Sequence, residues 1–346
     1  MHKATRSLWL LAVITLLISI LFSIACSRKD GIHKFAGRAQ GTSYHISFWA
    51  GRAIDSGEIQ QAVGDELSRI DRIMSGYRAD SIIEQFNAER SSEPVVVGAE
   101  IVALIEAARA VNVATKGCYD PTIKPVFELW GFQSDYFTPP DSNTIHRAMT
   151  SVGIDKLRSS IDSLSKTSSA LQVDLSSIAQ GYSVAQVAAV LEQYGVVDYL
   201  VEIGGELVTR GRKPDGTSWR VAIEKPLPEA RSIDKIVTIK QLQPLAIMTS
   251  GTYRHFFDKD GKRYSHILDA RTGLPVEHST VAVSVFFPDA TAADAWSTAL
   301  LCLGSEAGIL VANQQGIPAL FVDQNEGKLI EEMSRPLLEF KEIAIE

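Results

Sequence analysis

An aspartate and a threonine stand four residues apart in the segment 292–303, whose apolar residues recur at helical spacing. Side chains at positions i and i+4 project from one face of a helix, so Asp294 and Thr298 are expected to lie side by side. A carboxylate and a hydroxyl are hard oxygen ligands that suit Mg²⁺, with a substrate phosphate and water completing the shell. An aspartate near a helix start is also explained by capping and by the helix dipole. Taken alone, the pair does not distinguish a metal site from an ordinary helix start.

The stretch Asp174–Tyr182 is a second candidate for chemistry. Residues 171–175 alternate apolar and polar like a short strand, and apolar residues then recur at helical spacing over 184–194 until Gly195. Either of the two serines in the stretch is expected to cap this helix. The N–H groups and positive dipole of a helix start suit a phosphate, and Asp174 is placed to bind a donor group of the same ligand. A capped helix with a surface aspartate explains the same residues.

Two further polar stretches each follow an expected strand. The segment 264–275 is dense in His, Asp, Arg, Thr and Gly, which is typical of a binding loop, and its His266 could transfer protons near neutral pH. The segment 249–253 ends a strand in a small polar turn. Ordinary turn chemistry explains either stretch taken singly.

These residues must be positioned by a mixture of helices and hairpins. The chain order favours an α+β fold with mixed, largely antiparallel sheets and packed helices, in one catalytic domain over 34–346. The segment 132–141 is expected to be an exposed excursion. Helices are expected over 54–74, 81–87, 100–115, 144–152, 292–303 and 305–314. Strands are expected over 35–48 (a pair broken at Gly41), 161–171 (a pair), 198–203, 206–211, 219–224, 236–242, 245–249, 256–264 (a hairpin), 281–287 and 319–322.

Composition and charge exclude one class of partner. The chain has 346 residues, 45% of them hydrophobic, and a formal net charge of −7, so it lacks the basic footprint of a nucleic-acid-binding protein.

Residues 1–25 begin with basic residues and continue in an apolar run that ends in Ser-Ile-Ala before Cys26, which resembles a bacterial lipoprotein signal. Lipidated Cys26 and a linker over 26–33 would then tether an exported protein to a membrane. An uncleaved membrane anchor is the alternative.

The chain has three cysteines. Besides Cys26, Cys302 lies in an apolar run and is expected in the core, whereas Cys118 is expected in a turn. We expect no disulfide between them, although export permits one. The spacing fits no cysteine metal motif.

Taken in order, these stretches resemble one family, the FAD:protein FMN transferases (ApbE family). The resemblance runs from Ala39 to about Gly304 and rests on nine motifs in chain order. They are Gln40-Gly-Thr42; Tyr77 with Ser81 and Asn87; Asp120-Pro-Thr122; Leu129-Trp-Gly-Phe132; Asp174 with Gly181-Tyr182; Gly204-Gly205-Glu206; Ser250-Gly251; His266 with Asp269 and Thr272-Gly273; and Asp294 with Thr298.

The resemblance implies Mg²⁺-dependent transfer of FMN from the substrate FAD to a Ser or Thr hydroxyl of an acceptor protein, with release of AMP. The acceptor is expected to be an exported or membrane redox subunit. The implied metal ligands are Asp294, Thr298 and the backbone carbonyl of Ser177. The implied proton acceptor is His266 or a nearby aspartate such as Asp269. The implied contacts to FAD are Gln40, Tyr77, Cys118, Tyr119, Asp120, Asp174, Gln180 and the segment 266–268, which includes Leu268.

Three positions depart from the family pattern. Gln40 stands where Met is usual, Gln180 where Lys or Glu is usual, and Ala270 where Pro usually follows the aspartate. Gln180 brings no charge, which puts its contact to FAD in doubt. Two other functions fit the same residues: an FAD pyrophosphatase that passes FMN to water, and a non-enzymatic FAD-binding lipoprotein.

Overall fold

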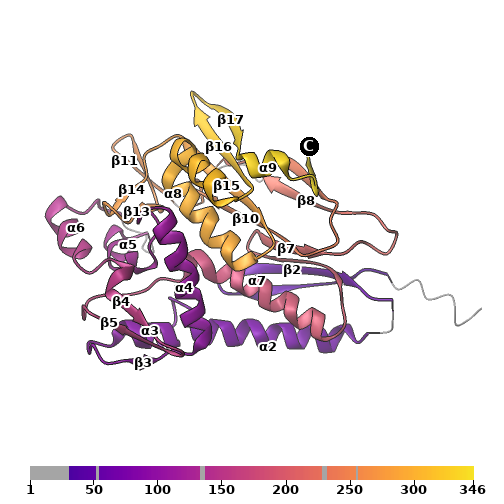
Figure 1. The fold of residues 1–346 in the computed structure, drawn as a ribbon, viewed down its shortest axis with the longest axis horizontal. Coiled ribbons are helices and arrows are strands. Elements are labelled where there is room, and N and C mark those ends of the chain that lie inside the picture. Colours follow the sequence, from indigo (N-terminus) through magenta and orange to yellow (C-terminus); the bar gives the residue numbers. More distant parts are fainter. Residues whose placement is uncertain (1–30, 52–53, 133–136, 228–231, 255) are drawn as a thin grey trace, which may run out of the picture.

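An eight-stranded antiparallel sheet organises the molecule (Figure 1). In this computed structural model, residues 31–51, 54–132, 137–227, 232–254 and 256–346 are described. The strand order is β1-β2-β6-β7-β10-β15-β16-β17, and every neighbouring pair runs antiparallel. The predicted α+β class with largely antiparallel sheets is therefore confirmed.

The strands of the large sheet are β1 (His33–Ala39), β2 (Thr42–Trp49), β6 (Asp198–Ile203), β7 (Glu206–Arg210), β10 (Leu245–Gly251), β15 (Thr280–Phe287), β16 (Ala319–Asn325) and β17 (Lys328–Met333). A three-stranded sheet has the order β18 (Ile343–Ile345), β9 (Ile233–Ile239), β8 (Trp219–Glu224). A second has the order β3 (Val95–Val96), β5 (Ser163–Lys166), β4 (Leu157–Ser159). Two short hairpins are β11 (Phe256–Lys259) with β12 (Lys262–Ser265), and β13 (Leu268–Asp269) with β14 (Leu274–Pro275).

The helices are α2 (Ser56–Met74), α3 (Ile82–Ala88), α4 (Ala99–Ala114), α5 (Lys124–Trp130), α6 (Ser142–Met149), α7 (Ser176–Gln193), α8 (Ala290–Gln315) and α9 (Arg335–Glu339), with short 3₁₀ turns η1 (Pro121–Ile123) and η2 (Ile154–Lys156). The predicted helices of the N-terminal half lie where expected. In α2, for example, Asp55 caps the first turn and the buried residues recur three or four apart.

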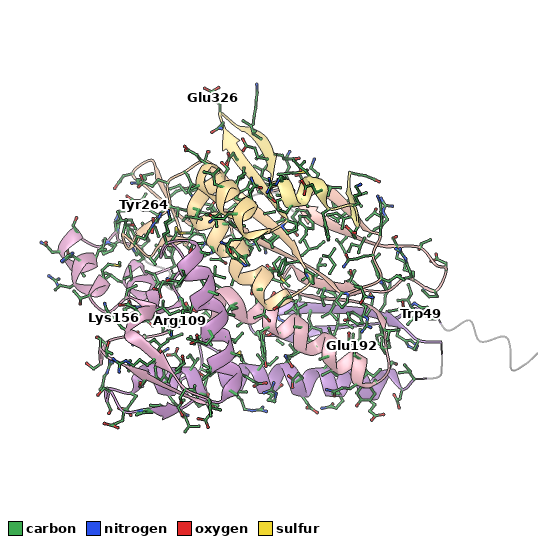
Figure 2. All side chains as sticks on the ribbon, viewed as in Figure 1. Trp49, Arg109, Lys156, Glu192, Tyr264 and Glu326 are labelled. Atoms are coloured by element: carbon green, nitrogen blue, oxygen red, sulfur yellow. A yellow bond between two sulfur atoms is a disulfide. The ribbon has the colours of Figure 1, made fainter. Side chains whose placement is uncertain are left out.

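Two hydrophobic cores lie on opposite faces of the large sheet. Helices α2, α4, α7 and α8 lie together on one side (Figure 1) and bury the larger core. The three-stranded sheet of β8, β9 and β18 covers the other face through side chains such as Trp219 and Val221. In Figure 2, Trp49 and Tyr264 lie toward opposite ends of the molecule. Burial by both layers fixes the sheet that positions the candidate site residues.

Helix α8 is long and apolar enough to cross a membrane by length and composition. It packs instead against α7, β10 and β15 in the larger core, so burial in the protein accounts for its apolar sequence. The prediction of two helices here is confirmed, because Gly304 interrupts the helical geometry with a φ of 74°. The predicted signal segment and Cys26 lie outside the described residues.

Three local predictions are wrong, and the elements near the C-terminus were missed. Residues 171–175 form no strand and instead run as an irregular segment whose Asp174 N–H donates to the Pro121 carbonyl at 2.7 Å. The segment 161–171 contributes one strand, β5, whose partners are β4 and β3 rather than a neighbour within the segment. Phe137, in the expected exposed excursion, stacks on Phe257 with ring centroids 4.4 Å apart. The strand β17, the helix α9 and the strand β18 were not predicted, although Leu337 and Ile343 in them are buried in the smaller core.

Candidate functional site

The centre of the site is the crossing of α7 and α8. The Gly181 N–H on α7 donates to Asp294 Oδ2 on α8 at 2.8 Å. This close approach requires glycine, because a Cβ at position 181 would lie 2.3 Å from the Ala290 carbonyl oxygen and 2.6 Å from Asp294 Cβ. Asp294 is 5% exposed. Burial raises its pKa to about 7, and the Gly181 N–H partly opposes that rise.

The other two predicted metal ligands face the same place. Gly181 is four residues after Ser177, so in a regular helix its N–H points toward the Ser177 carbonyl. Because that N–H donates to Asp294, the Ser177 carbonyl and the Asp294 carboxylate lie beside each other. Thr298 is one turn from Asp294 on α8, and its hydroxyl lies 3.0 Å from the Ser250 hydroxyl at the end of β10. Asp294 and Gly181 thus meet from segments more than a hundred residues apart, and helical geometry places Thr298 and the Ser177 carbonyl one turn from them.

Glu206 adds a second buried carboxyl group that the sequence prediction did not assign to the site. It begins β7, is 6% exposed and accepts the Thr249 N–H at 2.9 Å. Burial and the nearby charge of Asp294 raise the pKa of Glu206 well above its ordinary value, while Arg254 opposes the rise. The Gly204-Gly205-Glu206 motif was a signal for this residue, but a motif alone does not show which carboxyl groups are neighbours.

The turn at Cys118–Asp120 meets the start of α7. The Ser177 hydroxyl donates to the Tyr119 hydroxyl at 3.1 Å. Burial raises the pKa of Tyr119, and the charges of Asp294, Asp174 and Asp120 raise it further. All three aspartates therefore lie within electrostatic range of one phenol.

Asp120 and Asp174 both lie near Tyr119, and both accept hydrogen bonds from nearby backbone N–H groups. Asp120 is buried and accepts bonds from the Thr122 N–H at 2.8 Å and the Ile154 N–H at 2.9 Å, which hold the turn rigid. Burial raises the pKa of Asp120 despite these bonds. Asp174 Oδ1 accepts the Ser176 N–H at 2.7 Å. The prediction that a serine caps α7 is therefore wrong: the N-cap is Leu175, and both serines lie inside the helix.

Gln40 and Gln180 lie on the sheet side of α7, whereas Tyr77 lies on the surface. The Gln40 side-chain amide donates to the Ser183 hydroxyl at 2.8 Å, and Gln40 has a positive φ of 52° in the β1–β2 turn. The Gln180 amide lies close to Gly204, where a Cβ would be 2.8 Å from Nε2. Tyr77 is 80% exposed. Gln180 is thus near the Gly204–Glu206 turn, Gln40 contacts α7 through Ser183, and Tyr77 lies at the surface.

The loop after β12 carries the predicted proton acceptors. His266 is half-buried between Ser265 and the short strand β13. Asp269 pairs with Arg271, with Oδ2 2.7 Å from Nη2, and its backbone carbonyl accepts the Gly273 N–H at 2.7 Å. Asp269 therefore closes the turn of this loop. Leu268 is buried beneath it.

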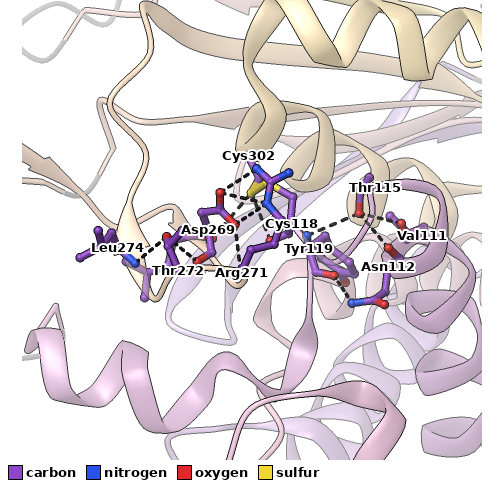
Figure 3. The surroundings of a disulfide bond; sticks show 11 residues. Val111, Asn112, Thr115, Cys118, Tyr119, Asp269, Arg271, Thr272, Leu274 and Cys302 are labelled. Carbon is purple, nitrogen blue, oxygen red and sulfur yellow. Dashed lines mark hydrogen bonds and ion pairs between the residues drawn. A yellow bond between two sulfur atoms is a disulfide. The ribbon is translucent and has the colours of Figure 1, made fainter. Parts of the chain in front are cut away.

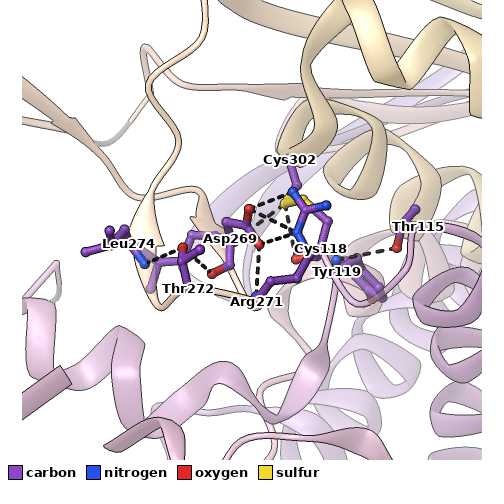
Figure 4. A network of polar contacts seen from close by, with 9 residues as sticks. Thr115, Cys118, Tyr119, Asp269, Arg271, Thr272, Leu274 and Cys302 are labelled. Carbon is purple, nitrogen blue, oxygen red and sulfur yellow. Dashed lines mark hydrogen bonds and ion pairs between the residues drawn. A yellow bond between two sulfur atoms is a disulfide. The ribbon is translucent and has the colours of Figure 1, made fainter. Parts of the chain in front are cut away.

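The prediction that Cys118 and Cys302 stay unbonded is wrong. They form a disulfide with Cα atoms 6.1 Å apart (Figure 3). Cys302 is buried in the core as expected, but the apolar run around it does not reveal that the Cys118 turn packs against the same helix. The Ala270 N–H donates to the Cys118 carbonyl at 3.1 Å, so the disulfide also anchors the loop that carries Asp269 and Arg271 (Figure 4). The disulfide and this hydrogen bond thereby join the Cys118–Asp120 turn, helix α8 and the loop after β12.

Together the fold and the site define a class: an antiparallel α+β protein with a buried, oxygen-lined acidic centre beneath polar loops. Such a centre suits a hard cation and a phosphate ester. The ApbE family model matches residues 40–321. The FAD:protein FMN transferase of Vibrio cholerae is 37% identical over 319 residues, covering 91% of this chain and 93% of that protein. The protein of the same name in Escherichia coli K12 is 33% identical, covering 91% of this chain and 92% of that protein.

Solved structures agree. The flavin transferase ApbE of Vibrio cholerae superposes with a TM-score of 0.81 at 35% identity, covering 90% of this chain and 99% of that one. The apo flavinyl transferase ApbE of Pseudomonas stutzeri gives the same TM-score and identity, covering 90% of this chain and 96% of that one. This chain belongs to the ApbE family.

Proposed function

We propose that this protein transfers FMN from FAD to a Ser or Thr hydroxyl of another protein. The acceptor oxygen bonds to the FMN phosphorus of FAD, the bond from that phosphorus to the bridging oxygen breaks, and AMP leaves with that oxygen. The observation that carries the proposal is the α7–α8 crossing, where the buried Asp294 accepts the Gly181 N–H of α7 in a member of the ApbE family.

The acidic centre fits Mg²⁺. Asp294, Thr298 and the Ser177 carbonyl are hard oxygen donors that would hold it. Burial raises the pKa of both Asp294 and Glu206, so a bound cation would stabilise their charged forms. A bound Mg²⁺ would neutralise part of the negative charge on the pyrophosphate of FAD.

The protein's own groups bind and orient FAD and take the proton. We assign FAD contacts to Gln40, Tyr77, the Cys118–Asp120 turn, Asp174, Gln180 and Leu268. The rigid turn at Asp120 is held by buried hydrogen bonds, so it is pre-organised for binding.

His266 is proposed to accept the proton of the incoming hydroxyl. His266 belongs to a loop fixed by the Asp269–Arg271 pair and by the disulfide, and an imidazole titrates near neutral pH. We assign Asp269 the role of positioning this loop, because its carboxylate is engaged by Arg271. Near-normal transfer by His266→Ala would remove the proposed base.

We further propose that the protein is an exported lipoprotein anchored through Cys26. The support is the sequence of residues 1–25 and the disulfide, because disulfides persist in oxidising compartments outside the cytoplasm. Replacing Cys26 by Ser should release the protein from membranes. A variant that stays in the membrane fraction and still carries residues 1–25 would favour an uncleaved anchor.

The experiment uses the chain from residue 27 onward with FAD, Mg²⁺ and candidate exported flavoprotein subunits. Covalent flavin fluorescence on a subunit after denaturing electrophoresis supports transfer. Free FMN and AMP without a labelled protein indicate hydrolysis instead. Bound FAD with no AMP released indicates a binding protein.

A further inference from the structure

Helix α5 begins with a buried lysine. Lys124 is 4% exposed, although lysine is among the residue types that are almost never fully buried unless they are paired. Its Nζ lies 2.8 Å from Glu128 Oε1 on the next turn of α5 and 3.3 Å from Glu84 Oε1 on α3. Burial lowers the pKa of this ammonium group, but the carboxylates of Glu128, Glu84 and Asp174 outweigh burial and hold its pKa above the ordinary value. The group therefore stays charged.

The contact to α3 links Lys124 to the segment that carries Asp174. Glu84 Oε1 also accepts the side-chain amide of Asn87 at 3.0 Å. Asn87 is buried and binds both backbone groups of Val173, donating to its carbonyl at 2.9 Å and accepting its N–H at 2.7 Å. Val173 directly precedes Asp174. An ion pair that served α5 alone would not need this second carboxylate.

The backbone of Asp174 closes a ring of contacts. Its N–H donates to the Pro121 carbonyl at 2.7 Å, and Pro121 lies three residues before Lys124. Its Oδ1 accepts the Ser176 N–H at 2.7 Å, so the carboxylate is oriented as well. The ring thus runs from the ammonium group through α3 to residues 173–174 and returns through Pro121 to the start of α5.

Two further segments to which we assign FAD contacts lie beside this ring. A Cβ at Gly76 would lie 3.8 Å from Glu84 Oε1, so the loop that carries Tyr77 passes next to Glu84. Asp120 directly precedes Pro121. The buried ammonium group therefore lies where the Tyr77 loop, the Asp120 turn and the Asp174 segment come together.

We propose that Lys124 is a positioning residue for FAD binding, whose charge holds the Asp174 carboxylate in place beside the acidic side chain of Glu84. The inference rests on the proposed function, in which Asp174 contacts FAD, and it adds a residue that acts through Asp174. Without the ammonium group, the negative charges of Glu84 and Asp174 are no longer offset at this point, and their repulsion moves Asp174 from its binding position.

The first test is Lys124→Gln, which removes the charge but keeps an N–H donor for Glu84 or Glu128. The Kd for FAD is measured by titration calorimetry in EDTA, which withholds the metal. We expect this Kd to rise about tenfold, the value of roughly one hydrogen bond to a charged group. The rate of AMP release at saturating FAD and Mg²⁺ should be unchanged, because Lys124 acts on binding alone.

The matched control is Lys235→Gln. Lys235 on β9 pairs with Glu331 on β17 at 2.9 Å, in the part of the fold that covers the other face of the large sheet. This control also removes one lysine from an ion pair, and it should leave the Kd for FAD at the wild-type value.

A double-mutant cycle separates positioning from a general loss of stability. Asp174→Asn keeps an oxygen that can accept the Ser176 N–H, so it should fold, and it should weaken FAD binding by itself. In that background Lys124→Gln should change the Kd by no more than about twofold, because Asp174 is the group through which Lys124 acts.

Three results would each overturn the proposal: an unchanged Kd in Lys124→Gln, an equal rise of the Kd in both backgrounds, or wild-type FAD affinity in Asp174→Asn. The last applies even if Lys124→Gln does not fold. Failure of the transfer function gives a different result, since the wild-type protein would then bind FAD but label no acceptor, and the comparison of Kd values would still stand.

Discussion

Replacing Gly181 by alanine tests the packing that holds Asp294. The added Cβ would lie 2.3 Å from the Ala290 carbonyl oxygen and 2.6 Å from Asp294 Cβ. The first of these is backbone, so no side chain can rotate away and α7 must move from α8. Gly181 does not need a left-handed conformation, since it is absent from the residues with positive φ. The effect of the substitution is therefore steric.

The magnitude follows from two opposing contributions. Overpacking a tight contact costs about 1–3 kcal/mol of unfolding free energy. Alanine in a helix interior returns about 1 kcal/mol relative to glycine. We expect a net loss of up to about 2 kcal/mol, or roughly 2–4 °C in Tm for each kcal/mol. Moving the helices apart also lengthens the bond from the Gly181 N–H to Asp294, so the concentration of Mg²⁺ needed for half-maximal AMP release should rise.

Thermal unfolding in EDTA and a Mg²⁺ titration of AMP release measure the two effects. The matched control is Gly64→Ala, because Gly64 lies within α2 and a Cβ there meets nothing within 4 Å. That control should raise Tm slightly and leave the Mg²⁺ requirement unchanged. A Gly181→Ala protein with wild-type Tm and wild-type Mg²⁺ dependence would refute the proposed packing at the metal site.

Three other perturbations have defined outcomes. Reducing the disulfide of Cys118 and Cys302, which are 184 residues apart, should lower Tm and raise the KM for FAD, as judged by scanning calorimetry and kinetics; a double serine variant should no longer respond to reductant. Asn87→Ala removes the hydrogen bonds of the Asn87 side chain to the buried Val173 N–H at 2.7 Å and to the Val173 carbonyl at 2.9 Å. Urea titration should show that the free energy of unfolding falls by about 2–4 kcal/mol, and a fall below about 1 kcal/mol would contradict this. The Arg69 guanidinium lowers the pKa of Glu100 below its ordinary 4.5, so this ion pair stabilises the fold fully above that pH and progressively less as pH falls. Glu100→Gln should therefore destabilise the protein at pH 7, by an amount that shrinks steadily as the pH is lowered below 4.5.

Local pattern predicted most of the elements around the site. The four-residue spacing of Asp294 and Thr298 was enough to place both on one helix face, because helical geometry is set by near neighbours. Gly195 ends α7 and Gly304 interrupts α8 with positive φ values of 74° each, as short-range signals indicate.

Contacts between distant segments could not be obtained from such patterns. The disulfide depends on how the Cys118 turn packs on α8, and an apolar run around Cys302 looks the same whether or not a partner sulfur faces it. Glu206 likewise becomes part of the site only because β7 and α8 bring it near Asp294. The capping of α7 was mispredicted because the helix already begins at Ser176, which puts both serines inside it, and Asp174 accepts the N–H of that first residue.

The most direct measurement follows AMP and protein-bound FMN in a single reaction of the enzyme with FAD, Mg²⁺ and an acceptor subunit. Covalent transfer predicts one AMP released for each FMN attached, with both products lost together in Asp294→Ala. AMP released in large excess over attached FMN, or full labelling by Asp294→Ala, would contradict metal-assisted transfer to a protein hydroxyl.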